Sequence, residues 1–169
     1  MRLIGRMVLA VGALILLFYM IFFATLAFQW LREPVVTADD EDVRYVAHWL
    51  YQRDEPVEIL NSYHPPANWA GDFEKEFAIR IDSDGISRFL ASPEAVRGDR
   101  IDGNLRRDVE FALVFAEKLA WFPTPEMIFS DKFHVAPVRT WDRQSGSDAV
   151  YLVLVEPAKE IAYYVEAKM

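Results

Sequence analysis

The sequence predicts an α+β fold in which a single transmembrane helix precedes an antiparallel β-sheet domain, with helices packed on one face of the sheet and a carboxy-terminal β-meander. Three observations support this prediction. The run from Met7 to Leu31 contains 25 residues and no charge. Farther along the chain, apolar residues recur with helical spacing. The carboxy-terminal part contains strand-like segments separated by short turn sequences.

The uncharged run predicts a membrane anchor. At about 1.5 Å per helical residue, the run is longer than the roughly 30 Å hydrocarbon core of a bilayer. The alternative is a cleaved signal peptide, with Arg2 and Arg6 as its basic start and Thr25 and Ala27 before the cut. Signal peptides have apolar cores of about 7–15 residues. The length of this run therefore favours an uncleaved anchor.

The flanking charges predict the orientation of the anchor. Arg2, Arg6 and the terminal amine precede the run, whereas one basic residue, Arg32, follows it together with Glu33 and an acidic cluster at 39–42. Basic flanks stay on the cytoplasmic side. We therefore expect a cytoplasmic segment at 1–6, a transmembrane helix at 7–31, a short tether at 32–37 and an extracytoplasmic α+β domain at 38–169. In a bacterium, this anchors the protein in the inner membrane, with the domain in the periplasm.

One face of the anchor is expected to contact another transmembrane helix. Gly5, Gly12 and Tyr19 recur at a spacing of seven residues and share a helix face. Glycines allow a second helix to approach closely, and a phenol hydroxyl in hydrocarbon needs a hydrogen-bond partner. The alternative is that Tyr19 bonds a carbonyl of its own helix.

Three helices are expected in the outer domain. The first spans 38–53, is capped by Thr37 and has apolar residues on one face. The second is a short helix within 83–92, capped by Ser83 or Asp84 and ended by Pro93. The third spans 104–122 and has the widest apolar surface. Its expected buried residues are Leu105, Val109, Phe111, Ala112, Leu113, Val114, Phe115, Ala116 and Ala120.

The remaining segments predict strands. An edge strand is expected at 57–63, followed by a proline-containing loop at 63–72 and a better strand at 73–82. Three further strands, at 132–141, 148–155 and 160–167, are separated by hairpin-sized linkers and predict the meander.

Composition excludes several functions. Residues 32–169 contain 16 basic and 26 acidic residues, a formal charge of −10. This charge argues against nucleic acid as a partner and against binding to anionic lipid surfaces. The chain has no cysteine, which excludes disulfides, thiolate catalysis and zinc sites made of cysteines.

No sequence motif predicts a metal site, a cofactor or catalytic residues. The acids at 39–42 are consecutive and lack the interleaved glycine and distal glutamate of a calcium loop. They are expected to begin a helix, where its dipole favours negative charge. The three histidines, His48, His64 and His134, lie in different predicted elements and have no HExxH spacing.

Glu74 and Glu76 flank Lys75 on a predicted strand. This pattern predicts a solvated face and does not favour the carboxylate pair of a glycosidase.

Aromatic residues in proline-rich loops predict a binding function. Such residues bury a large area with little loss of entropy. The expected partner-binding residues are Tyr63, His64, Trp69, Trp121 and Phe122. The alternative is that these aromatics close the open ends of the sheet as part of the core.

The resulting hypothesis is a non-enzymatic, single-pass inner-membrane protein whose periplasmic domain binds another protein. It would be an immunity or inhibitor protein against a toxin, or an accessory subunit of an envelope complex. The negative charge of the domain suits a basic partner. The alternative is a membrane-anchored hydrolase of envelope polymers that uses His64 or His134 with an acid.

Overall fold

The computed structural model describes residues 2–31, 36–51, 56–65, 73–138 and 149–168. The chain forms two compact units, Met1–Glu33 and Pro34–Met169. The first unit is the helix α1 (Arg2–Leu31). The second is a mixed α+β domain built on a six-stranded antiparallel sheet.

In α1, the apolar side chains that the structure describes are exposed, and Tyr19 stacks on Phe23 of the same helix with ring centroids 6.4 Å apart. A Cβ added at Gly12 would meet no atom within 4 Å. Over the described residues, no helix combines the length and the apolar character needed to cross a membrane. The transmembrane helix at 7–31, and its contact face of Gly5, Gly12 and Tyr19, therefore stay predictions from the sequence.

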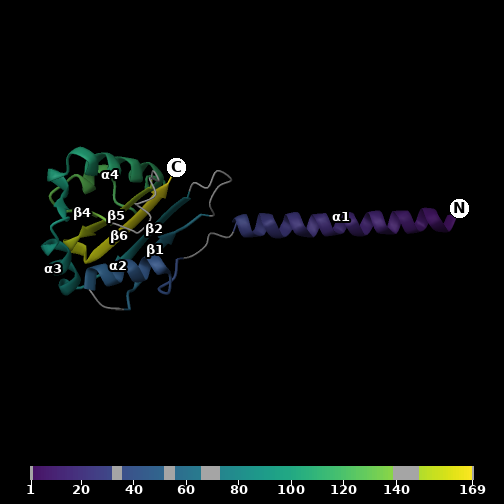
Figure 1. Cartoon of the computed structure of the whole chain (residues 1–169), viewed down its shortest axis with the longest axis horizontal. Helices are drawn as coiled ribbons and strands as arrows, with labels where there is room; N and C mark the ends of the chain where they lie inside the picture. Colours follow the sequence, from purple (N-terminus) through teal and green to yellow (C-terminus); the bar gives the residue numbers. More distant parts are fainter. Residues whose placement is uncertain (1, 32–35, 52–55, 66–72, 139–148, 169) are drawn as a thin grey trace. The chain divides into compact units, whose positions relative to one another are not determined.

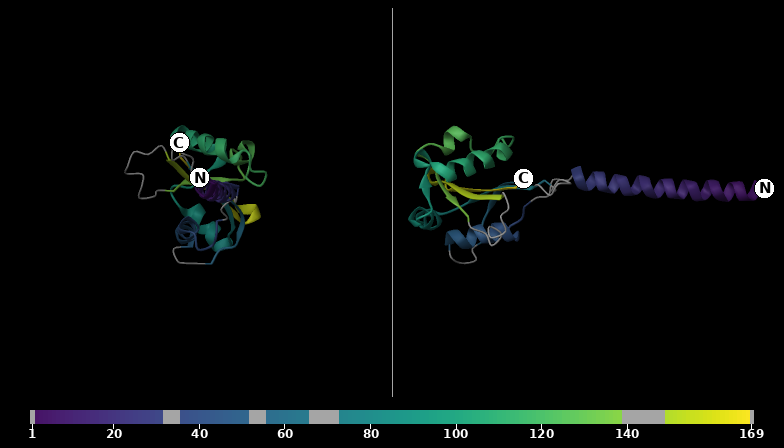
Figure 2. Two further views of the ribbon diagram at one scale, coloured as in Figure 1. Left: turned by 90° about the vertical axis from the view of Figure 1, so that its right-hand side faces the viewer. Right: turned by 45° about the horizontal axis from the view of Figure 1, so that its top comes forward.

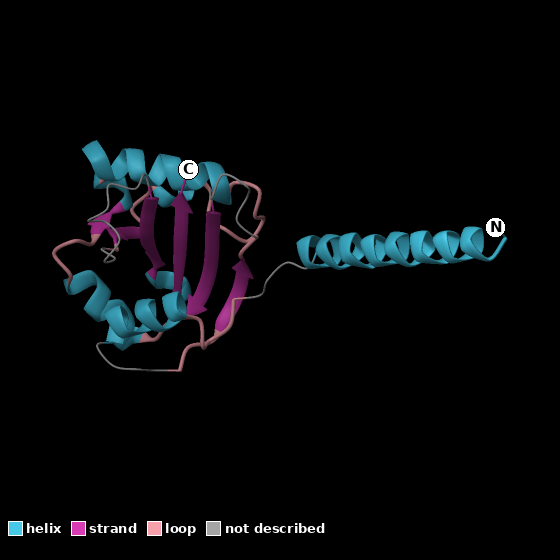
Figure 3. Ribbon diagram, turned by 45° about the vertical axis from the view of Figure 1, so that its right-hand side comes forward, coloured by secondary structure: helices cyan, strands magenta, loops and turns pink. Residues whose placement is uncertain are grey.

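The sheet has the strand order β1-β2-β6-β5-β4-β3, and all neighbours are antiparallel (Figure 3). Its strands are β1 (Ile59–Tyr63), β2 (Phe73–Arg80), β3 (Val96–Arg97), β4 (His134–Pro137), β5 (Ala149–Glu156) and β6 (Ile161–Lys168). The last three follow one another as a meander. β3 was not expected from the sequence, because two residues are too few to show a strand pattern.

Helices cover both faces of the sheet, so the prediction that they pack on one face was wrong. α2 (Glu41–Tyr51) and α3 (Ser83–Ala91) cover one face, called the α2 face. α4 (Gly103–Ala116) and the short α5 (Pro125–Ile128) cover the other, called the α4 face (Figures 1 and 2). The physical reason lies in β5, whose eight residues are all buried. A strand that is apolar on both sides must be covered on both sides.

The helix boundaries differ from the expected ones because of local capping. α2 begins at Glu41, where the Asp40 carboxylate accepts a hydrogen bond from the Asp42 backbone N–H, so Asp40 replaces Thr37 as the cap. α3 is capped by Asp82, whose side chain accepts from the Gly85 N–H, and not by Ser83 or Asp84.

α4 confirms the buried positions Val109, Ala112, Leu113 and Ala116, but it ends at Ala116, well before Pro123. The expected burial of Val114 was wrong, because its side chain is 72% exposed. Ala120 is exposed as well.

Candidate functional site

Ionisable side chains gather where β2 and β6 pair. In this register Lys75 lies opposite Glu166, and Glu76 lies opposite Val165. Successive residues of a strand point to opposite faces. Lys75 and Glu166 therefore lie on the α2 face, whereas Glu76 lies on the α4 face.

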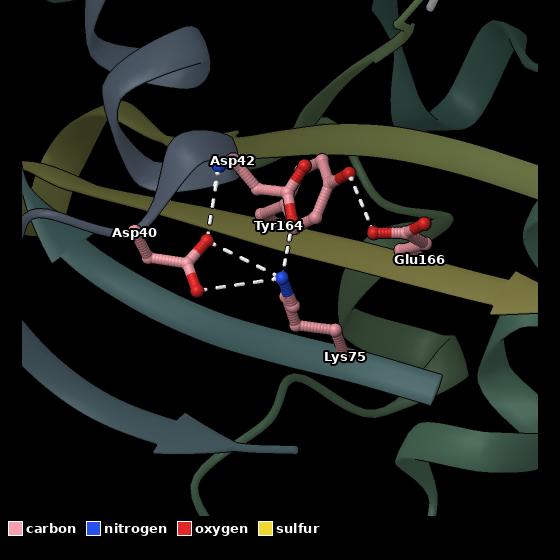
Figure 4. Close-up of polar contacts among 5 residues, drawn as sticks. All are labelled: Asp40, Asp42, Lys75, Tyr164 and Glu166. Atoms are coloured by element: carbon pink, nitrogen blue, oxygen red, sulfur yellow. Dashed lines mark hydrogen bonds and ion pairs between the residues drawn. The ribbon is translucent and has the colours of Figure 1, made fainter. Parts of the chain in front are cut away.

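On the α2 face, five residues form the lysine cluster (Figure 4). They are Asp40, Asp42, Lys75, Tyr164 and Glu166. The Lys75 ammonium donates to an Asp42 oxygen and lies 3.3 Å from Asp40 Oδ1. Lys75 is only 12% exposed. The acidic cluster was expected to begin a helix. It also supplies the counter-charges of a nearly buried lysine.

The lysine cluster keeps its central cation charged. Burial alone would lower the pKa of Lys75, but the hydrogen bonds and charges of Asp42 and Asp40 outweigh it, and the pKa is raised. Glu166 accepts a hydrogen bond from the Tyr164 hydroxyl at 3.2 Å. Burial, with the charge of Asp42, raises the pKa of Glu166 to about 7, against the opposing effect of Lys75.

On the α4 face, Glu74 and Glu76 form a carboxylate pair with fewer partners. The Glu74 Oε1 atom accepts from the Lys118 ammonium, which follows α4, whereas its Oε2 atom has no hydrogen-bond partner among the described residues. Glu76 is 0% exposed, and neither of its carboxylate oxygens has a partner there. Burial and the neighbouring Glu74 raise the pKa of Glu76 to about 8, although Lys118 lowers it. The Glu76 carboxyl is therefore mostly protonated at pH 7.

The solvated face predicted for Glu74, Lys75 and Glu76 was wrong. β2 lies between β1 and β6 in the sheet, and each of its faces is covered by a helical layer. Glu76 is buried and the Glu74 side chain is 14% exposed, and both lie on one face of β2. A glycosidase places its two carboxylates on either side of the scissile bond. Since Glu76 is fully covered, however, a polymeric substrate has no access to it in this structure.

A third feature is a groove of about 390 Å³ between α4 and α5, called the acidic groove. Its apolar lining residues are Leu113, Val114, Pro125 and Phe129. Its charged residues are Arg106, Glu110, Glu117 and Glu126. Arg106 pairs with Glu110 at 2.9 Å and lies 4.4 Å from the centre of the Phe129 ring. The two remaining glutamates, Glu117 and Glu126, give the groove a net negative charge.

The expected partner-binding aromatics lie in different environments. Tyr63 ends β1, and the Lys118 ammonium lies 4.6 Å from the centre of its ring. Trp121 is half-buried and packs against Phe122. Phe122 is only 6% exposed and packs on Tyr163, so it belongs to the core on the α4 face. Trp69 lies outside the described residues.

His64 lies beside the lysine cluster. Burial and the charge of Lys75 lower the pKa of His64, whereas Asp40 and Asp42 oppose this. Both aspartates already bind Lys75, whose positive charge largely offsets their electrostatic effect on the imidazole of His64.

The other two histidines have different neighbours. His48 is exposed on α2 and lines a groove of about 490 Å³ that also contains Trp49 and Phe89. His134 is on β4, and burial together with Arg97 lowers its pKa. Among the described residues, no three histidine, aspartate or glutamate side chains lie close enough together to hold a metal ion.

Comparison with protein-family models, with curated proteins and with solved structures finds no match for this chain.

Proposed function

We propose that the chain is a single-pass inner-membrane protein whose periplasmic domain binds another protein through the acidic groove. The observation that supports this most directly is the exposure of Val114. A valine that is 72% exposed lines a groove together with other apolar residues and with glutamates. An apolar centre with a charged rim is the usual composition of a protein interface.

The charges of the groove favour a basic partner. Arg106 is neutralised by Glu110, whereas Glu117 and Glu126 keep their negative charge in the groove. A partner that places an apolar side chain on Val114 and lysines or arginines beside it would complement both features. The charge of −10 on the outer domain would also speed the encounter with such a partner at low salt.

The anchor rests on the sequence alone. The run from Met7 to Leu31 has no charge, and α1 is one continuous helix over Arg2–Leu31. With this anchor, the domain would meet partners at the membrane surface. An immunity protein against a basic toxin and an accessory subunit of an envelope complex both fit this position.

The rival function, hydrolysis by a histidine with an acid, has less support. The acids beside His64 pair with Lys75, and His134 has Arg97 and Asp99 as its charged neighbours. A neighbouring carboxylate would favour a histidine base by stabilising its protonated form. Lys75 removes that effect at His64.

The groove is tested with two matched substitutions in the full-length chain. Val114→Arg removes the apolar centre and repels a basic partner, while Leu90→Arg makes the same change at a residue of α3 that is 42% exposed. Partners are crosslinked in membranes, captured and quantified. We expect Val114→Arg to reduce the captured basic partner about tenfold or more, as for an interface anchor, and Leu90→Arg to leave it unchanged. Equal capture by both variants would exclude the groove.

The membrane topology is tested separately with reporter fusions after Met169. A phosphatase that folds only in the periplasm should be active there, and a reporter that works only in the cytoplasm should be silent. The reverse pattern would show that the flanking charges were misinterpreted.

A further inference from the structure

The contact between β2 and the segment that follows α4 contains two carboxylates and one ammonium. Lys118, two residues beyond the end of α4, binds Glu74, and its ammonium lies over the Tyr63 ring. Glu76 is buried two residues along the same strand and face, with both oxygens unpartnered among the described residues. Burying an ionised carboxylate without a partner is far more unfavourable than burying a neutral carboxyl.

We propose that Glu76 is a proton switch that controls whether residues 117–122 stay packed on the α4 face of the sheet. With the proton bound, Glu76 is neutral and stays buried on the face that Leu119, Trp121 and Phe122 help to cover. When the proton passes to water, a second negative charge forms beside Glu74, and the covering segment opens so that water can solvate it.

The groups around Glu76 leave the new charge poorly compensated. On β2 the nearest acid is Glu74, and across the strand pairs Glu76 faces Tyr63 of β1 and Val165 of β6. After α4, Lys118 is the cation that acts on it, and this ammonium already binds Glu74. Lys75 and Glu166 lie on the opposite face of the sheet. One shared cation therefore faces two carboxylates once Glu76 ionises.

Opening of this segment would affect the surface used for binding. Glu117 begins the segment and lines the acidic groove. Phe122 ends it and packs on Tyr163 with ring centroids 5.6 Å apart. A periplasmic domain experiences the pH of its surroundings, so the proton would connect external pH to the shape of the groove.

Linkage gives the opening a defined dependence on pH. In the closed form the pKa of Glu76 is about 8, whereas in an open, hydrated form it returns towards its ordinary value of 4.5. Between these two values each added pH unit therefore favours opening about tenfold, and above pH 8 the effect levels off.

The test is hydrogen exchange of the full-length chain between about pH 5 and pH 9, with rates corrected for the intrinsic effect of pH. In the wild type, protection of residues 117–122 should fall about tenfold per unit up to about pH 8 and then level off. This segment should also be less protected than β5, since the proposed opening is local.

Glu76→Gln cannot ionise and should abolish the dependence of this protection on pH. Glu58→Gln, at an exposed glutamate that precedes β1 and pairs with Arg80, should keep it.

Lys118→Met provides a second variant if Glu76→Gln does not fold. Removing the ammonium that lowers the pKa of Glu76 should move the levelling point to higher pH. The proposal is overturned by a slope that survives in Glu76→Gln, by the absence of a slope in the wild type, or by residues 117–122 exchanging only together with β5. If only Lys118→Met can be measured, the proposal is overturned when its slope levels off at the same pH as in the wild type.

Discussion

Lys75 and Glu76 are neighbours on β2, yet one side chain stays charged when buried and the other becomes largely neutral. Lys75, on the α2 face, is surrounded by Asp40 and Asp42 and remains charged. Glu76, on the α4 face, has no hydrogen-bond partner among the described residues and is largely neutral at pH 7. The difference arises from the covering layers. The start of α2 supplies two acids to one face, whereas the segment after α4 supplies one lysine to two acids.

This comparison shows how a charged residue can serve two purposes. A buried ion with good partners fixes one arrangement of the chain, because removing a partner leaves the other buried and uncompensated. A buried acid without partners makes the arrangement depend on pH instead. The two faces of one strand thus combine a fixed contact with a contact that responds to protons.

The largest expected effect is that of Glu76→Gln on stability at high pH. The pKa of Glu76 is raised from 4.5 to about 8 in the folded chain. Its contribution to stability is therefore complete below about pH 4.5 and is lost as the pH rises towards 8. A shift of this size corresponds to as much as about 5 kcal/mol. Urea unfolding of the wild type should show this loss between about pH 5 and pH 9.

Glu76→Gln should lose much less stability over the same range, retaining the slope due to Glu166, whose pKa is also raised. If both chains lose stability equally, Glu76 is ionised throughout and its burial has been overstated. Since this measurement reports global unfolding, it tests the proton of Glu76 independently of any local opening of residues 117–122.

Several elements of the fold could be predicted because their signals are local. The buried side of α4, with Val109 and Leu113, follows from helical periodicity. β5 and β6 follow from their apolar and β-branched residues. The coverage of both faces was predictable too, since β5 has no charged residue before Glu156. A run without alternation predicts burial on both sides.

The ionisable site could not be predicted, because its contacts join distant parts of the chain. Glu74 binds a lysine 44 residues away, and Lys75 binds acids 33 and 35 residues away. Seen alone, the alternation of Glu74, Lys75 and Glu76 has the pattern of an exposed strand. Only the position of β2 inside the sheet reverses that interpretation.

The acidic groove was missed for a related reason. Val114 extends the apolar stripe of α4 in the sequence and was therefore expected to be buried. The helix presents it beside α5 instead of towards the sheet. Periodicity places a residue on a helix, but the width of the covered stripe depends on how neighbouring elements pack.

A smaller effect is expected from Lys75→Met, which removes the central charge of the lysine cluster and keeps most of its apolar stem. Asp40 and Asp42 would then be left partly buried without their cation. We expect a loss of about 2–4 kcal/mol in the free energy of unfolding at pH 7, near the range for breaking a buried ion pair.

Arg88→Met is the matched control, because Arg88 and Asp84 form an exposed pair on α3. Its loss should be within about 0.5 kcal/mol. Urea unfolding of the two full-length variants compares them directly. A loss no larger for Lys75→Met than for Arg88→Met would mean that the α2 face is not held by its charges, and that the contrast between the two faces of β2 lies in Glu76 alone.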